Sequence, residues 1–265
     1  MAALLRAGIS SADGQPDGAT AGADRTAPAH ILDFLPAKRR RLIVASQSKD
    51  LRLKMARMVF YSFADAQAGI VDVGRRIAAQ GWAPATAGNY SARTADGFAV
   101  TASGRHKGRL TESDILRLDG DGAVIGDGRP SAETALHLAL YRRFPDAGAV
   151  LHGHSPAAVA LTRAYPARIE WRFAGHEMLK AFPGVTTHKT AITLPIVDNS
   201  QDMAVIEAAV MPALNPPGVA PAYLIRDHGL YAWGADLDEA ERILEAVEWL
   251  IAAELAERGF REKAR

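Results

Sequence analysis

Two histidines separated by one residue carry the strongest chemical signal in this sequence. His152 and His154 follow the apolar residues 149–151, which predict a short strand, and Pro156 ends the extended run. Because side chains alternate between the faces of a strand, both imidazoles should point the same way. Two neighbouring imidazoles on a stiff backbone can chelate a borderline-soft cation such as Zn²⁺. The pattern therefore predicts part of a metal site.

His228 is a candidate for the third ligand, because it lies in a tight Asp-His-Gly turn between two predicted strands. Three histidines on a divalent cation leave one coordination position open, as in catalytic zinc sites. The chain has no cysteine, so a transition metal must be held by histidine and carboxylate. The residues alone leave other histidines open for this role: His176 and His188, and with weaker claims His106 and His137.

Two glutamates are candidates for proton transfer. Glu133 falls in the first turn of a predicted helix that begins at residues 130–131, where exposed N–H groups favour an acid in any case. Glu177 follows a histidine in a helix predicted over 175–182, where an exposed glutamate is common. Neither position is diagnostic by itself.

Three small polar stretches can hold an anion. Gly88-Asn89, Ser103-Gly104 and Pro130-Ser131 each place backbone N–H groups or hydroxyls at a turn or a helix start. Such groups bind phosphate through peptide dipoles, and Lys107 and Arg109 would add positive charge. Each stretch taken singly also fits an ordinary turn.

Composition limits the class of protein. With 265 residues, 48% of them hydrophobic and 23% charged, the chain resembles an ordinary globular protein. Residues 1–60 hold ten basic and five acidic side chains, whereas residues 61–265 hold twenty-one and twenty-five, which argues against nucleic-acid binding by the larger part. No apolar run approaches the roughly 20 residues needed to cross a bilayer. The lack of cysteine fits a reducing cytoplasm, where we expect the protein to act.

The order of predicted elements indicates an α/β fold. Residues 1–55 lack apolar periodicity and predict a disordered extension, leaving residues 56–265 as the catalytic domain. Short strands joined largely by hairpins, with helices between them, indicate helices on the faces of a mainly antiparallel sheet. The predicted helices span 63–80, 130–144, 157–165, 175–182, 201–214 and 238–259; the predicted strands span 98–101, 116–118, 124–125, 149–151, 191–197, 222–226 and 230–233, with one more ending at Arg93.

Taken together, these motifs resemble the class II aldolase/adducin family, with a match over about residues 63–258. Within it, the chain is most similar to the methylthioribulose-1-phosphate dehydratases. The family features are Gly88-Asn89, Ser103-Gly104, Ser131-Ala132-Glu133, His152-Gly153-His154 and Asp227-His228-Gly229. The features of the dehydratase branch are the stretches 103–110, 130–134, 177–180 and 223–234.

The resemblance implies a single three-layer α/β/α domain with a central, mainly antiparallel sheet, and a homotetramer. It also implies one Zn²⁺ per subunit on His152, His154 and His228. The sugar-phosphate substrate would place its phosphate near Asn89, Ser103, Gly104 and Ser131, with Lys107 as a further contact. No nucleic-acid or membrane partner is implied.

The resemblance further implies a division of roles between the two glutamates. In the aldolases the residue matching Glu133 is the acid/base, whereas in the dehydratases the residue matching Glu177 does this work. We therefore favour Glu177 for the proton steps, and expect it to be partly desolvated with a raised pKa.

The implied reaction is the dehydration of 5-methylthioribulose 1-phosphate to 2,3-diketo-5-methylthiopentyl 1-phosphate in methionine salvage. The alternatives are a zinc-dependent fuculose- or rhamnulose-phosphate aldolase, in which Glu133 is the acid/base, and a sugar-phosphate 4-epimerase. A non-catalytic, adducin-like interaction module is a further alternative. It predicts lost ligands, whereas all three histidines and both glutamates are present.

Overall fold

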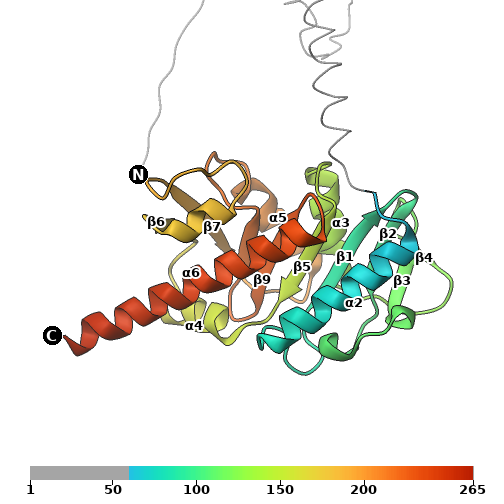
Figure 1. The fold of residues 1–265 in the computed structure, drawn as a ribbon, viewed down its shortest axis with the longest axis horizontal. Helices are drawn as coiled ribbons and strands as arrows, with labels where there is room; N and C mark the ends of the chain where they lie inside the picture. The colour runs from blue at the N-terminus through green and yellow to red at the C-terminus, as the bar shows by residue number, and fades with distance from the viewer. Residues whose placement is uncertain (1–59, 265) are drawn as a thin grey trace, which may run out of the picture. The chain divides into compact units, whose positions relative to one another are not determined.

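A single mixed sheet forms the centre of the computed structural model, which describes residues 60–264 (Figure 1). The predicted extension over residues 1–55 lies outside the described residues. The order of the nine described strands is β4-β3-β2-β1-β5-β9-β8-β7-β6, and only β7 and β8 pair in parallel. The strands are β1 (Asn89–Thr94), β2 (Gly97–Thr101), β3 (Ile115–Leu118), β4 (Val124–Ile125), β5 (Ala149–Gly153), β6 (Glu170–Ala174), β7 (Ala191–Val197), β8 (Ala222–Ile225) and β9 (Gly229–Gly234).

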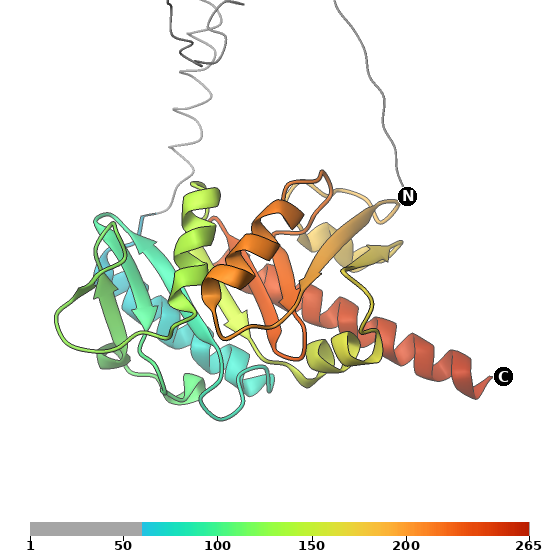
Figure 2. The same ribbon diagram turned by 180° about the vertical axis from the view of Figure 1, so that it is seen from behind.

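Helices cover both faces of this sheet, which confirms the predicted three-layer α/β/α class. Helices α2, α4 and α6 pack with η4 on one face, where they close the larger hydrophobic core (Figure 1). Helices α3 and α5 lie on the other face over a second core (Figure 2). The helices are α2 (Phe63–Ala79), η2 (Lys107–Arg109), η3 (Glu112–Asp114), α3 (Thr134–Arg143), α4 (Pro156–Ala164), η4 (Glu177–Ala181), α5 (Met203–Ala213) and α6 (Leu237–Lys263). No helix in residues 60–264 is long and apolar enough to cross a membrane.

Strand β5 occupies the middle of the sheet and is buried along its whole length between β1 and β9. Its side chains alternate as expected for a strand covered on both faces. Ala149 and Leu151 belong to the core under α6, whereas Val150 belongs to the core under α3 and α5. His152 therefore points to the α3 and α5 side of the sheet.

Two segments differ from the sequence-based predictions. Residues 175–182 were expected to form an α-helix, but Glu177–Ala181 form the short 3₁₀ helix η4 between glycines at positions 175 and 184 that have positive φ. The strand Glu170–Ala174 was not predicted, although Trp171 and Phe173 are buried and alternate with exposed neighbours. This alternation is the ordinary sign of a strand with one buried face.

Strands β5 and β9 approach closely at Gly229, so we expect replacement of this glycine to destabilise the fold. Gly229 pairs near Gly153, and a Cβ built at Gly229 would overlap the carbonyl oxygen of Gly153 and lie 3.2 Å from Cε1 of His152. We expect Gly229→Ala to lower the free energy of unfolding by roughly 1–3 kcal/mol, because backbone must move to relieve the overlap. Urea unfolding measures the change.

The matched control is Gly120→Ala in the β3–β4 turn, where a Cβ meets no atom within 4 Å. It should unfold at the same urea concentration as the parent protein. Equal stability of Gly229→Ala and Gly120→Ala would show that the β5–β9 contact is not tight.

Candidate metal centre

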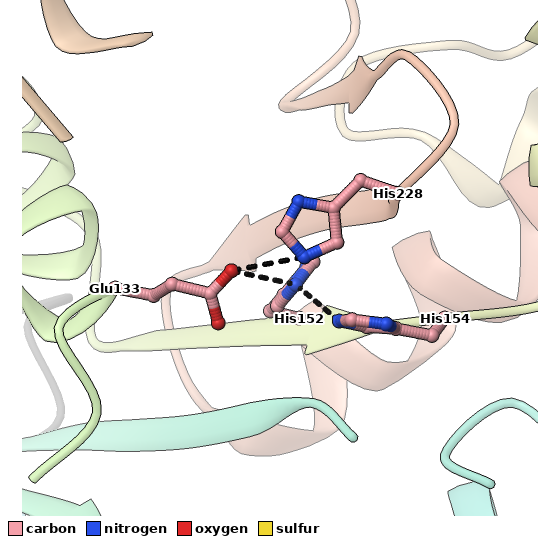
Figure 3. Close-up of side chains that lie close together, drawn as sticks. All are labelled: Glu133, His152, His154 and His228. Atoms are coloured by element: carbon pink, nitrogen blue, oxygen red, sulfur yellow. Dashed lines mark hydrogen bonds and ion pairs between the residues drawn. The ribbon is translucent and has the colours of Figure 1, made fainter. Parts of the chain in front are cut away.

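Four side chains from separate parts of the sequence meet at one end of the sheet. Glu133, His152, His154 and His228 each offer a ligand atom, and these atoms all lie within 4.8 Å of one another (Figure 3). His152 is the second-last residue of β5, His154 follows the strand, His228 lies in the β8–β9 turn, and Glu133 occupies the N-cap position of α3. The structure thus brings together the three histidines that the sequence analysis selected.

The ring of His152 is completely buried and held on two sides. Its Nδ1 lies 3.0 Å from the carbonyl oxygen of Leu230, and its ring stacks on Tyr231 with 4.0 Å between ring centroids. If Nδ1 carries the proton and donates it to this carbonyl, the lone pair of Nε2 is directed at the other three side chains. This is the tautomer that a metal ligand needs.

His154 faces His152 across a short gap, with 2.8 Å between the two Nε2 atoms. Its backbone N–H donates to the carbonyl oxygen of Trp82 over 2.6 Å, which fixes the chain just past the strand. Burial lowers the pKa of His154 to about 3, and the neighbouring His152 and His228 act in the same direction. The side chain is therefore neutral at physiological pH, as metal binding requires.

The β8–β9 turn presents His228 to the same point. Asp227 adopts a left-handed conformation with φ 57°, and its N–H donates to Oγ1 of Thr162, so the turn is tied to α4. Nδ1 of His228 lies 3.3 Å from Oδ1 of Asn199, while Nε2 points inward. A partner on the outer nitrogen orients a metal-binding imidazole and sets its tautomer.

Glu133 supplies the negative charge of the cluster. Its Oε1 lies 3.0 Å from Nε2 of His228 and 3.6 Å from Nε2 of His152, and its Oε2 accepts a hydrogen bond of 2.6 Å from Nδ2 of Asn89. Burial acts to raise the pKa of Glu133, but hydrogen bonds and charge from His152 and His228 outweigh it and hold the pKa well below the usual range. The carboxylate is therefore ionised at neutral pH.

These four groups fit a divalent transition-metal ion. Imidazole nitrogens and carboxylate oxygens are suitable donors, three imidazoles converge from one side, and the carboxylate balances positive charge. The outer nitrogens of His152 and His228 each have a hydrogen-bond partner of the kind that orients a metal-binding imidazole.

A cavity of about 250 Å³ adjoins the cluster and contains the residues predicted to hold phosphate. Lys107 is 1% exposed, and its Nζ donates to the carbonyl oxygens of Thr86 and Arg105. Burial lowers the pKa of Lys107 to about 8, and the charge of Glu133 opposes this shift. The cavity is lined by Thr86, Ala87, Gly88, Asn89, Ala102, Ser103, Gly104, Lys107, Ser131, Glu133 and His154. Arg109 is not among these residues.

Glu177 does not join the cluster in this chain. Its side chain is 69% exposed and pairs with Lys180 and His188. The hydrogen bond from Lys180 lowers its pKa, so the expectation of a desolvated Glu177 with a raised pKa is wrong for the single chain. Its helix η4 packs against α6, on the face of the sheet opposite to His152.

The other histidines have different surroundings. His137 is fully buried under the sheet, where Nδ1 lies 2.7 Å from Oγ of Ser91 and the ring meets the edge of Tyr231, which in turn stacks on His152. His176 pairs with Glu254, His188 pairs with Glu177, and His106 accepts a hydrogen bond from Gly108 at the start of η2. His228 is thus the histidine that joins the pair. The sequence did not indicate the support that His137 gives to Tyr231.

Residues 68–255 match the family model of the class II aldolase and adducin N-terminal domain. The chain belongs to the class II aldolase and adducin family. The resemblance found in the sequence is therefore confirmed, and the fold agrees with it.

Similar proteins include dehydratases and an aldolase. A methylthioribulose-1-phosphate dehydratase from Acidiphilium cryptum is 51% identical over 197 residues, which are 72% of this chain and 90% of that protein. A second methylthioribulose-1-phosphate dehydratase, from Xanthomonas campestris pv. campestris, is 50% identical over 183 residues, which are 68% of this chain and 84% of that protein. The crystal structure of l-fuculose-1-phosphate aldolase from Thermus thermophilus matches with a TM-score of 0.62 and 29% identity, over 76% of this chain and 99% of that chain.

Because His137 is buried, we expect the free energy of unfolding to fall in weak acid. Burial lowers its pKa to about 3 in the folded protein, whereas an unfolded histidine has its ordinary value near 6.5. Between these values the unfolded chain binds one more proton, so the free energy of unfolding should fall as the pH falls below about 6.5. His137 should contribute about 1.4 kcal/mol per pH unit between roughly pH 6 and 4.5.

Urea unfolding of metal-free protein at several pH values measures this contribution. In His137→Gln the slope should be smaller by about that amount, whereas His188→Gln, at a side chain that is 49% exposed, should keep the parent slope. An unchanged slope in His137→Gln would mean that His137 is not held neutral by the fold.

Proposed function

We propose that this chain is a zinc-dependent dehydratase that converts 5-methylthioribulose 1-phosphate to 2,3-diketo-5-methylthiopentyl 1-phosphate. The observation that carries the proposal is the cluster of three histidines and Glu133 beside a cavity that holds a buried lysine. Identity of about half to methylthioribulose-1-phosphate dehydratases supports this substrate. The reaction belongs to methionine salvage, in the cytoplasm.

His152, His154 and His228 would hold one Zn²⁺ per subunit. The bound ion supplies Lewis acidity toward carbonyl and hydroxyl oxygens of the substrate. The chain itself contributes three imidazoles, with His152 fully buried and the turn that carries His228 tied to α4.

The phosphate would bind in the adjoining cavity. Lys107 carries positive charge at neutral pH, because its pKa of about 8 leaves it mostly protonated. Asn89, Ser103 and Ser131 add polar groups, and Gly104, with φ 72°, offers its backbone N–H without a side chain in the way. A phosphate bound in this cavity would place the sugar carbons next to it at the histidine cluster.

Glu133 and Glu177 would divide the proton steps. Ionised Glu133 suits acceptance of the C3 proton, since the carboxylate stands at the cluster. As the C3–H bond breaks, its electron pair forms the C3–C4 double bond, and the C4 hydroxyl leaves as water with a proton from Glu177. The C3 enol that results then tautomerises: its hydroxyl loses a proton and C4 gains one, which gives the 2,3-diketone.

A Glu177 that acts at this centre would come from a second copy of the chain. It lies on the opposite face of the sheet from its own His152, and its side chain is exposed. Contact with another subunit would desolvate the carboxyl group and raise its pKa toward the range of a proton donor. We propose a homotetramer in which neighbouring chains complete each other's site.

The central prediction is the product of the reaction. Zinc-loaded protein given 5-methylthioribulose 1-phosphate should release water and form a diketone phosphate that retains every carbon of the substrate, as followed by mass spectrometry. His152→Ala should lose zinc and turnover together, because the remaining imidazoles hold the ion poorly. A parent protein that binds zinc but leaves this substrate unchanged would contradict the proposal.

The alternative is a class II sugar-phosphate aldolase, favoured by the position of Glu133 at the cluster and by the structural likeness to l-fuculose-1-phosphate aldolase. An aldolase breaks a carbon–carbon bond, so fuculose or rhamnulose 1-phosphate should then yield dihydroxyacetone phosphate. A 4-epimerase would instead return an isomer of unchanged mass. Each outcome is distinct in the same product analysis.

The role of Glu177 can be tested separately from that of the metal. Glu177→Gln should bind zinc normally but lose about 10²–10⁴-fold in turnover, because a positioned acid is removed. Glu170→Gln, an exposed glutamate on β6, should keep parent activity.

Mixing subunits then locates the acid. Glu177→Gln and His152→Ala protein, each inactive alone, should regain activity when refolded together, because some sites receive intact histidines from one chain and Glu177 from another. Turnover of Glu177→Gln within a few-fold of the parent would show that the proton donor has been misassigned.

A further inference from the structure

A buried carboxylate on α6 stands directly behind the histidine cluster. Glu248 is 2% exposed, and its Oε2 accepts a hydrogen bond of 2.5 Å from Oγ of Ser155. Ser155 is the residue that follows His154, and its Oγ also accepts the N–H of Ala158 at the start of α4. The hydroxyl of Ser155 thus links the long helix α6 to the backbone immediately after His154.

His154 differs from the other two histidines in how its ring is supported. The outer nitrogens of His152 and His228 each have a protein partner, Leu230 and Asn199. Within residues 60–264, Nδ1 of His154 has none. A metal-binding imidazole usually needs such a partner to fix its orientation. The position of His154 must therefore come from its backbone.

That backbone is anchored on both sides. Before Ser155, the N–H of His154 donates a hydrogen bond to the carbonyl oxygen of Trp82. Gly153 lies close under α6, because a Cβ built at this glycine would be 3.8 Å from Leu244. After His154, the anchor is the hydrogen bond from Ser155 to Glu248. Removing the second anchor would leave only the first to locate the imidazole.

The choice of glutamate at position 248 is costly for the fold. Its neighbours Val247, Leu250 and Ile251 are buried apolar residues, and an apolar side chain would satisfy the same packing. Burial raises the pKa of Glu248 to about 7, and Oε1 has no hydrogen-bond partner in the described part of the chain. Placing in this core a carboxyl group with only one oxygen hydrogen-bonded costs stability, which points to a use for the oxygen that accepts from Ser155.

We propose that Glu248 is a positioning residue that holds His154 in the geometry of a metal ligand, acting through Ser155. The inference builds on the proposed metal centre, but concerns residues outside it. Glu248 touches neither the ligand atoms nor the cavity for the phosphate. Its effect should appear first in metal affinity.

The test compares the zinc dissociation constants of parent and variant proteins, measured by competition with a chromophoric chelator. Glu248→Leu keeps the packing volume but loses the acceptor, so its zinc affinity should fall about 10-fold or more, within the range seen for outer-layer residues of metal sites. Glu248→Gln retains an oxygen that accepts from Ser155, and should bind zinc within a few-fold of the parent.

Glu241→Leu is the matched control. Glu241 is a second buried glutamate of α6, but it pairs with Arg76 of α2 rather than with the chain near His154. Its replacement should lower the thermal midpoint of the metal-free protein while leaving zinc affinity unchanged. Equal losses of zinc affinity in Glu248→Leu and Glu241→Leu would show that the loss comes from a general decrease in stability, and would overturn the inference.

Further outcomes separate the inference from the proposed function. Parent-like zinc binding by Glu248→Leu would overturn the role of Glu248 and leave the metal centre intact. A parent protein that binds no zinc would instead refute the metal centre itself. If Glu248→Leu fails to fold, Ser155→Ala gives the same comparison: a 10-fold loss supports the inference, and parent affinity overturns it.

Discussion

The contact between β5 and β9 at Gly153 and Gly229 is the constraint on which the rest of the site depends. The two backbones approach so closely at Gly229 that a Cβ there would overlap the carbonyl oxygen of Gly153, while a Cβ at Gly153 would lie 3.1 Å from the carbonyl oxygen of Trp82. This approach sets Leu230 against the ring of His152 and brings the β8–β9 turn, with His228, beside the same strand. A looser pairing would separate ligands that come from positions more than seventy residues apart in sequence.

The charges at the cluster follow from this close packing. Burial keeps His137 and His154 neutral, whereas Glu133 stays ionised because the imidazoles of His152 and His228 face it. An ionised carboxylate beside imidazole nitrogens suits the binding of a divalent cation. The buried amine of Lys107 lines the adjoining cavity, so positive charge lies beside the carboxylate of Glu133.

Much of the fold could be predicted from the sequence because its signals are local. The stripe of Ile70, Val73 and Ile77 becomes the buried face of α2, and the apolar run before His152 becomes a strand covered on both faces. The third ligand was different, since the residues alone left His176 and His188 as equals of His228. Only the resemblance to a family, and then the pairing of β5 with β9, selects among them.

Other features depend on contacts that no local pattern records. Glu177 is exposed on the short helix η4, which forms between two glycines rather than as a full α-helix. Its neighbour Lys180 lowers its pKa at a spacing that also occurs on ordinary surface helices. The link from Glu248 to Ser155 joins residues 93 positions apart, and becomes visible only when α6 lies behind β5.

The central claim is that three imidazoles from β5 and the β8–β9 turn bind one divalent cation. X-ray absorption spectroscopy of stoichiometrically zinc-loaded protein tests it most directly. The account predicts one ion per chain with three imidazole nitrogens at about 2.0–2.1 Å and an additional oxygen ligand. A spectrum with fewer imidazoles, unchanged when His228 is replaced by alanine, would contradict it.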